Sequence, residues 1–195
     1  MKVRQLGVGG FDDNFSYLGV TGNGDAFIVD PTGNADIIRR AVAEAGDIRP
    51  GGILLTHRHR DHYTALDEVL EFFPAPVFEH ANLTDRQVLP FGAGALQVLF
   101  TPGHTADSVC YRATDGSALF TGDTLFVGYI GFCKPEPMYR SLYEVLGALD
   151  GAHVIYPGHD YGEAPTDTLA HQRLVNPWLR CVSYSEFVEE LKNLT

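Results

Sequence analysis

One short segment, THRHRDH at positions 56–62, places three histidines and an aspartate within seven residues. In an extended segment alternate side chains point the same way, so His57, His59 and Asp61 are expected on one face. His62 falls where the following stretch begins to look helical. Packing so many polar groups together costs free energy unless they share a partner, and a transition metal ion is such a partner. Imidazole and carboxylate without a thiolate suit zinc, iron or manganese.

Three later segments each present one further donor, flanked by Gly or Pro and preceded by an apolar run. They are His104 in PGHT, Asp123 in TGDT and His159 in PGHD. Strand ends that deliver ligands from turns have this appearance. The sequence therefore predicts that these three donors join the four of the first segment in one metal site.

Composition favours a single domain over residues 1–195, since 45% hydrophobic and 20% charged residues are typical of globular proteins. The net charge of −11 and the scattered lysines argue against nucleic acid as a partner, so a small-molecule substrate is expected. The chain contains no apolar run of 18 residues, so no membrane partner is expected. The first residues do not read as a secretory signal, which predicts a cytoplasmic location. The sequence makes no prediction about the oligomeric state.

The elements that must position the donors fall into two groups of strands, each followed by helices. The expected strands are 3–6, 15–20, 26–29, 52–55 and 76–79, and then 88–91, 96–100, 108–112, 118–121 and 153–156. The expected helices are 35–45 and 63–73, and then 137–149, 166–175 and 185–194. This pattern predicts an α/β fold in which two sheets pack face to face under outer helices. The donors of both halves would meet along one edge of the sandwich.

The order HxHxDH followed by a distant His, Asp and His resembles the metallo-β-lactamase superfamily. The resemblance implies a four-layer αβ/βα sandwich with a metal site at the edge of the two sheets. The segments TPGHT and FTGDTLF, at 101–105 and 120–126, are most similar to the glyoxalase II and persulfide dioxygenase branch.

Carried over residue by residue, the resemblance implies two metal ions. Site one would be formed by His57, His59 and His104. Site two would be formed by Asp61, His62 and His159, and Asp123 would bridge the two. Zinc is the expected metal, with iron and manganese as alternatives. Two such ions can lower the pKa of a shared water and polarise a carbonyl, so the resemblance implies hydrolysis of a thioester or a similarly activated acyl compound.

An alternative remains open, because persulfide dioxygenases are similar in sequence but use one iron. The two histidines and one carboxylate of such a site would be His57, His104 and Asp123. One departure also matters: Phe132 stands where glutathione-thioester hydrolases are expected to carry an arginine. Recognition of glutathione is therefore not predicted.

Four residues receive more specific roles. Asp61 is a candidate for handling a proton as well as binding metal. Asp30 follows an apolar strand and either orients a ligand histidine or serves as a plain turn carboxylate. Tyr129 and Tyr161 lie beside donor segments and are predicted to reach a substrate oxygen.

Overall fold

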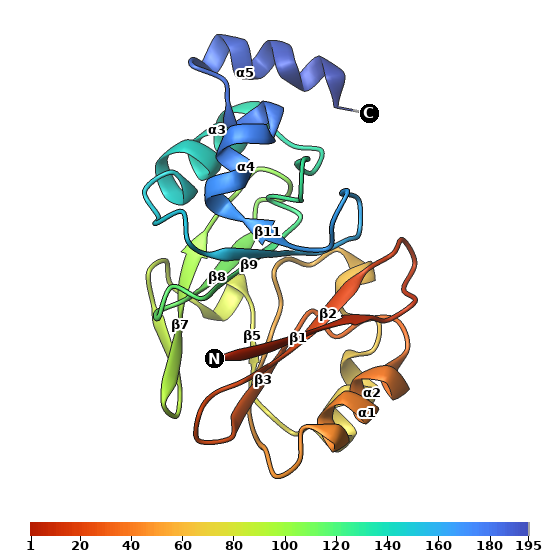
Figure 1. Cartoon of the computed structure of the whole chain (residues 1–195). Helices are drawn as coiled ribbons and strands as arrows, with labels where there is room; N and C mark the ends of the chain where they lie inside the picture. Colours follow the sequence, from red (N-terminus) through yellow and green to blue (C-terminus); the bar gives the residue numbers. More distant parts are fainter. Residues whose placement is uncertain (195) are drawn as a thin grey trace.

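Two β-sheets pack face to face, and helices cover the outer face of each (Figure 1). The computed structural model describes residues 1–194. One sheet has the order β1-β2-β3-β4-β5 and the other β11-β10-β9-β8-β7-β6. Each sheet is built from consecutive elements of one half of the chain. The predicted four-layer sandwich is confirmed.

The first sheet mixes antiparallel and parallel pairs. Its strands are β1 (Lys2–Gly7), β2 (Phe15–Val20), β3 (Asp25–Val29), β4 (Arg49–Leu54) and β5 (Val77–Phe78). The β1–β2 and β2–β3 pairs are antiparallel, and the β3–β4 and β4–β5 pairs are parallel. The two parallel steps each need a crossover, which the helices α1 (Ala35–Glu44) and α2 (Leu66–Phe72) provide.

The second sheet is mainly antiparallel. Its strands are β6 (Val88–Phe91), β7 (Gly94–Phe100), β8 (Val109–Ala113), β9 (Ala118–Gly122), β10 (Val154–Pro157) and β11 (Asp167–Thr168). Only β9 and β10 run parallel, and the helical segment between them is their crossover. The short β11 was not predicted, because two residues are too few to show a periodic pattern.

The helices are short and several are extended by tighter or wider turns. They are α1 (Ala35–Glu44), α2 (Leu66–Phe72), α3 (Pro135–Arg140), α4 (Leu169–Val175) and α5 (Tyr184–Glu190). The 3₁₀ turns are η1 (Arg60–His62), η2 (His80–Asn82), η4 (Pro177–Leu179) and η5 (Leu191–Asn193), and η3 (Ser141–Leu146) is a π-helix. Asn34 caps α1, because its side chain accepts a hydrogen bond from the Asp36 amide.

The helix expected over 166–175 begins only at Leu169, because β11 precedes it and Thr168 is its cap, and the helix expected over 185–194 changes to a 3₁₀ turn after Glu190. Two further predicted helices differ from the structure for local reasons. The helix expected over 63–73 begins only at Leu66, because Thr64 is tied to the neighbouring loop: its hydroxyl accepts a hydrogen bond from the Gly33 amide at 2.9 Å. The helix expected over 137–149 begins earlier, with Pro135 in its first turn, where a missing N–H has no cost. That helix changes to π-helical geometry at Ser141 and ends before Gly147.

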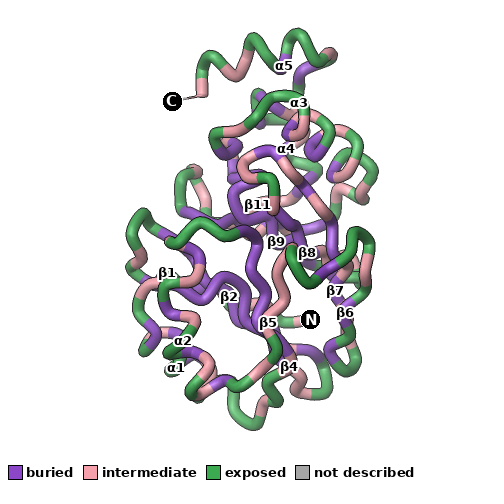
Figure 2. Tube along the Cα trace, turned by 180° about the vertical axis from the view of Figure 1, so that it is seen from behind, coloured by how far each residue is buried: buried purple, intermediate pink, exposed green. Residues whose placement is uncertain are grey.

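Three apolar layers hold the four structural layers together. Phe27, Tyr17 and Phe120 belong to the layer between the sheets, where their rings meet edge to face. A second layer, which includes Ile38 and Val69, packs the first sheet against α1 and α2, and a third packs the second sheet against α3, α4 and α5. Figure 2 shows this arrangement as buried strands in the centre and exposed loops and helix faces at the periphery.

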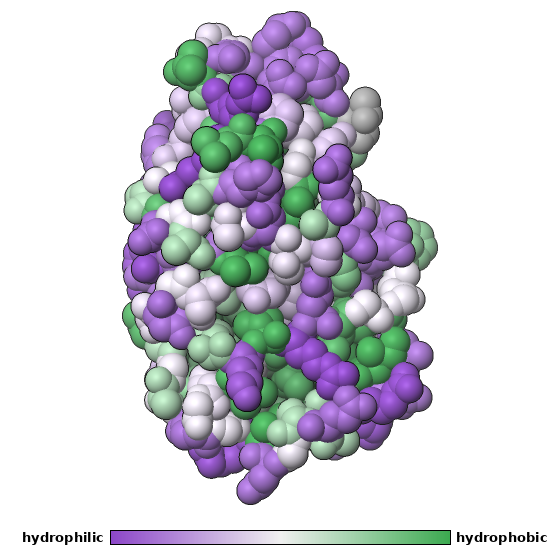
Figure 3. All heavy atoms as spheres, viewed as in Figure 1, coloured by the Kyte–Doolittle hydropathy of each residue, from purple (hydrophilic) through white to green (hydrophobic). Residues whose placement is uncertain are grey.

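The surface in Figure 3 is mixed: hydrophilic residues dominate over α5 at the top, and hydrophobic residues form separate groups below. Among residues 1–194, no helix combines the length and the apolar character that crossing a bilayer requires.

Candidate metal centre

The seven predicted donors lie in loops at one edge of the sandwich, where strands of both sheets end. Four come from the segment after β4, which carries His57 and His59 and then turns through η1 (Arg60–His62). The other three follow β7, β9 and β10 as His104, Asp123 and His159. Because β9 and β10 are parallel, their carboxyl ends lie at the same edge, which brings the last two donors together.

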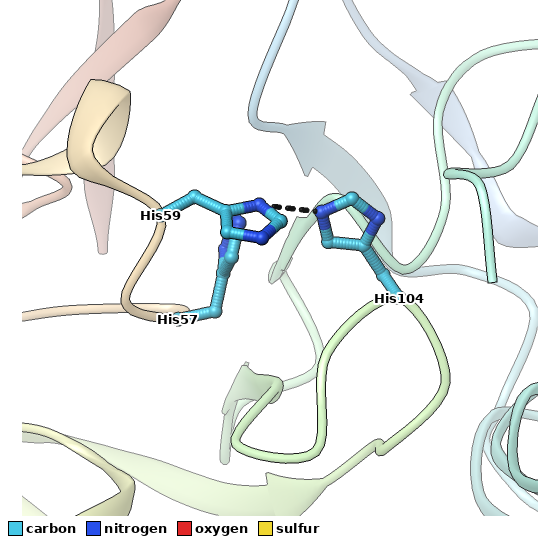
Figure 4. Close-up of side chains that lie close together, drawn as sticks. All are labelled: His57, His59 and His104. Carbon is cyan, nitrogen blue, oxygen red and sulfur yellow. Dashed lines mark hydrogen bonds between the residues drawn. The ribbon is translucent and has the colours of Figure 1, made fainter. Parts of the chain in front are cut away.

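The donors form three overlapping groups of three, one of which, His57, His62 and Asp123, shares a histidine with each of the other two. His57, His59 and His104 form one of those two groups, and their ligand atoms all lie within 4.8 Å of one another. Asp61, His62 and His159 form the other group, within the same limit. Figure 4 shows the first group: His57 and His59 approach from one segment and His104 from the opposite one, with Nδ1 of His59 facing Nε2 of His104 at 2.9 Å.

Asp123 lies between the two groups. Its Oδ2 atom is 3.5 Å from Nε2 of His104 and 3.3 Å from Nε2 of His159, so one oxygen faces a histidine of each group. Its Oδ1 atom is 3.3 Å from Nε2 of His62, and Oδ2 is 3.9 Å from Nε2 of His57. A carboxylate in this position can contact two cations at once.

The chemistry of the cluster fits metal ions better than it fits a hydrogen-bonded core. Within residues 1–194, Nε2 of His57, Nε2 of His62 and Oδ1 of Asp123 are buried and have no hydrogen-bond partner. Unpaired polar atoms at the centre of a protein are costly unless something else satisfies them. All three atoms belong to predicted ligands, so the cluster has the donor atoms for cations and lacks protein partners for them.

In the first half of the chain the histidines are oriented by side chains. The Asp30 carboxylate is buried, and it accepts hydrogen bonds from the Thr56 amide, the Thr56 hydroxyl and Nδ1 of His62, at 2.8, 2.6 and 3.0 Å. Nδ1 of His57 lies 3.2 Å from the same Thr56 hydroxyl oxygen. With Nδ1 engaged in this way, Nε2 of both rings faces the cluster.

Asp30 itself has a left-handed backbone, with φ of +47°. A non-glycine residue adopts this conformation only where its surroundings fix it, and such strain is found at functional sites. Of the two roles considered for Asp30, its contacts match the orienting one.

In the second half the histidines are oriented by backbone carbonyls. Nδ1 of His104 donates to the Phe132 carbonyl at 2.8 Å, and Nδ1 of His159 donates to the Asp12 carbonyl at 2.6 Å. A carbonyl can only accept, so Nδ1 of each ring carries a hydrogen and Nε2 faces the cluster.

The pKa values of the imidazoles in the cluster shift in opposite directions. Burial, together with the neighbouring His62, lowers the pKa of His57 to about 2, so that ring is neutral and its Nε2 keeps a lone pair. Burial also lowers the pKa of His104. Although burial acts in the same direction on His62, the Asp123 and Asp30 carboxylates raise its pKa well above the usual range. Burial raises the pKa of Asp123, but the surrounding imidazoles outweigh it and hold that pKa far below normal.

Two glycines allow the loops to close around the donors. A Cβ atom on Gly158 would lie 2.3 Å from Oδ1 of Asp123, and one on Gly131 would lie 2.3 Å from the Asp123 carbonyl. The Gly131 position is also 2.8 Å from Nδ1 of His104. No other residue type fits at either place without displacing a donor.

An open cleft of about 430 Å³ reaches the cluster. Its lining includes two of the donors, His104 and Asp123, and the remaining lining residues are Asp12, Phe126, Tyr129, Ile130, Gly131, Phe132 and Tyr161. The structure therefore brings both predicted substrate tyrosines to the cleft. The Tyr161 ring stacks on His159, with ring centroids 4.8 Å apart and planes 4° apart.

The donor segment differs from the expected extended geometry at one point. Alternation holds for His57 and His59, which share a group, but the chain then turns through η1 and directs Asp61 to the other group with His62. All seven predicted donors converge, and their role as metal ligands stays a prediction.

No sequence pattern indicated a role at the site for two of its residues, Asn14 and Asp12. Asn14 is buried, donates from Nδ2 to Oδ2 of Asp61 at 3.1 Å and lies 3.4 Å from Nε2 of His159. Asp12 receives the His159 hydrogen bond on its carbonyl and the Tyr161 hydroxyl on its carboxylate. Both lie in an irregular loop far from every donor in the sequence, where no spacing indicates a role.

The model of the metallo-beta-lactamase superfamily matches residues 9–86 and 81–159, a span that includes all seven donors. The chain belongs to this superfamily. It is a superfamily of metal-binding proteins, and the curated relatives of this chain include hydroxyacylglutathione hydrolases and a probable metallo-hydrolase.

Two relatives and one solved structure place the chain more closely. It is 31% identical to the hydroxyacylglutathione hydrolase of Francisella philomiragia, over 86% of this chain and 71% of that protein. It is 32% identical to the probable metallo-hydrolase YqgX of Bacillus subtilis, over 92% and 98% of the two chains. The crystal structure of ETHE1 from Myxococcus xanthus superposes with a TM-score of 0.86 at 29% identity, covering 100% of this chain and 92% of that one. These similarities confirm the predicted glyoxalase II and persulfide dioxygenase branch.

Proposed function

We propose that the protein is a metal-dependent hydrolase of thioesters, with two divalent ions held by the seven donors. The observation that carries this proposal is the position of Asp123 between two groups of three donors, at the floor of an open cleft. A site for a single ion needs three or four protein ligands, so seven converging donors suit two ions. The proposed assignment keeps His57, His59 and His104 for one ion and Asp61, His62 and His159 for the other.

The reaction adds water across the acyl–sulfur bond. The carbonyl carbon gains an oxygen from water, the carbon–sulfur bond breaks, and the products are a carboxylic acid and a free thiol. Bound ions would supply a water of lowered pKa and a Lewis acid for the carbonyl. We propose zinc as the metal, because imidazole and carboxylate donors suit it, although the same donors also suit iron and manganese.

The protein's own groups have three tasks in this scheme. Asp30, Thr56 and the backbone carbonyls fix the ring orientations, so no donor has to reorganise when substrate arrives. The aromatic cleft wall offers an apolar surface to the acyl group. Asp61, 27% exposed at the side chain and hydrogen-bonded to Asn14, is the carboxylate placed to accept a proton from the attacking water.

A second candidate activity is oxidation of a persulfide by a mononuclear iron centre. The similarity to ETHE1 favours it, and three of the donors would suffice: His57, His104 and Asp123. The Nε2 atoms of the two histidines lie 3.9 and 3.5 Å from Oδ2 of Asp123, so these three donors also converge. Two histidines and a carboxylate are the ligand set of many non-haem iron oxygenases.

Metal content and reaction type separate the two activities. Protein purified without chelator is analysed for metals per chain, and is then assayed for thioester hydrolysis and for oxygen uptake with a persulfide. Two ions per chain and hydrolysis that disappears after dialysis against EDTA, and returns with zinc, are the expected result. One iron per chain together with oxygen uptake and no hydrolysis would replace the hydrolase proposal with the dioxygenase.

A further inference from the structure

The cleft wall has one charged side chain that is not a predicted metal ligand, and that side chain is acidic. Asp12 lines the cleft together with the rings of Phe126, Phe132 and Tyr161. Among the cleft residues that the structure describes, none is lysine or arginine. The cation Arg60 borders a separate hollow, which it shares with Phe11, Asp61 and Thr64. An anionic group of a substrate would therefore meet a carboxylate in this cleft and no opposite charge from the wall.

Asp12 also determines what Tyr161 offers to a substrate. The Tyr161 hydroxyl donates its only hydrogen to Oδ2 of Asp12. Stacking on His159 and edge contact with Phe126, at a centroid distance of 5.0 Å, hold the ring so that the hydroxyl stays at Asp12. With its hydrogen used, the phenol presents only oxygen lone pairs, and the pair as a whole accepts hydrogen bonds.

We propose that the Asp12–Tyr161 pair is a specificity determinant that selects thioesters of uncharged thiols carrying an amide N–H over thioesters of thiols carrying a carboxylate. The inference rests on the hydrolase function proposed above. An amide N–H can donate to either acceptor of the pair, whereas a carboxylate has no hydrogen to donate and is repelled by Asp12. The apolar rings on the same wall suit the uncharged part of such a substrate.

The test compares two substrates that differ by one carboxylate. Thioesters of N-acetylcysteamine and of N-acetylcysteine, made with the same acyl group, are hydrolysed by the zinc-loaded enzyme, and the ratio of their kcat/KM values is measured. The native protein is expected to prefer the uncharged substrate, and Asp12→Asn is expected to lower the ratio about 5- to 10-fold, since it removes one unit charge from the cleft. Asparagine keeps an oxygen that can accept the Tyr161 hydroxyl.

A matched control removes the same charge one residue away. Asp13 lies outside the cleft lining, and its carbonyl accepts the Asp160 amide at 3.1 Å, a contact that Asp13→Asn retains. Asp13→Asn is expected to leave the ratio within about twofold of the native value. An equal fall in the ratio for both variants would mean that Asp12 acts only through the general charge of the loop, and would overturn the proposal.

A binding measurement separates failure of this inference from failure of the hydrolase proposal. Non-hydrolysable S-alkyl ethers of the same two thiols are titrated calorimetrically into the native protein and into Asp12→Asn and Tyr161→Phe. Tighter binding of the uncharged ether, reduced in both variants, supports the specificity role even where no thioester is cleaved. If the native protein bound the carboxylate-bearing ether more tightly, the specificity role would be contradicted even where hydrolysis is fast.

Discussion

The two halves of the molecule build their share of the metal centre in different ways. The first half supplies four donors from one seven-residue segment, and the buried side chains of Asp30 and Thr56 orient two of them. The second half supplies three donors from three separate loops, and backbone carbonyls orient its two histidines. The histidines of the first half are therefore open to disruption through side chains, and those of the second half through the backbone paths of the loops that carry Phe132 and Asp12.

The largest effect on metal binding and turnover is expected from Asp123, which lies between the donors of the two halves. Asp123→Ala removes the carboxylate between the two groups, so we expect it to weaken binding of both ions and to reduce kcat by at least about 10³-fold. Asp61→Ala removes a donor of one group only, and should leave about one ion per chain with a smaller loss, on the order of 10²-fold. Metal analysis and steady-state hydrolysis check both variants. Turnover unchanged in Asp61→Ala would point to a single working ion.

A smaller effect is expected from changes to the groups that orient the ligand histidines. It compares orientation by a side chain with orientation by a backbone carbonyl. Asp30→Asn takes the negatively charged acceptor from Nδ1 of His62, and we expect metal affinity to fall about 10- to 100-fold. Phe132→Ala is the matched change in the second half, where the backbone carbonyl of residue 132 accepts from His104 and is retained in the variant, and it should leave affinity within about twofold. Competition with a chromophoric chelator measures both. Equal losses in the two variants would contradict the distinction between the halves.

The smallest effect concerns a loop of the second half. Buried Asn176 donates to the Tyr129 carbonyl at 3.1 Å, and so ties the cleft wall to the segment after α4. Asn176→Ala removes this hydrogen bond, although the Phe126 amide still donates to the same carbonyl at 3.0 Å, and it also removes the side-chain oxygen that accepts the Trp178 amide at 3.1 Å. The buried Trp178 amide is left without this acceptor, so we expect about 1–3 kcal/mol less stability and a raised KM with kcat little changed. Ser183→Ala is the control, since Ser183 caps α5 away from the cleft and its loss costs about 1 kcal/mol. Thermal unfolding and steady-state kinetics are measured for both variants. A raised KM in Ser183→Ala as well would attribute the change in Asn176→Ala to general destabilisation.

Local patterns predicted most of the elements and all seven converging side chains. Asn34 begins α1 as its residue type indicates, and the predicted strands are all present with ends shifted by a few residues. Helix boundaries were less predictable where tertiary contacts decide them. Thr64 delays α2 by its bond to the neighbouring loop, and nothing within its own segment indicates that bond.

The sequence by itself determined the kind of chemistry, because His, Asp, Gly and Pro in those local patterns limit what each segment can do. It determined the donor types, the order in which they occur and the sandwich that carries them. The alternation of side chains in an extended segment did not separate Asp61 from His59, and only the family resemblance predicted that division. In the structure a single 3₁₀ turn produces it. Tertiary structure alone decided the roles of Asp12 and Asn14, which lie about 145 residues from His159 in the sequence and in contact with it in the fold. Contacts over such separations depend on how two whole sheets pack, and no local pattern encodes them.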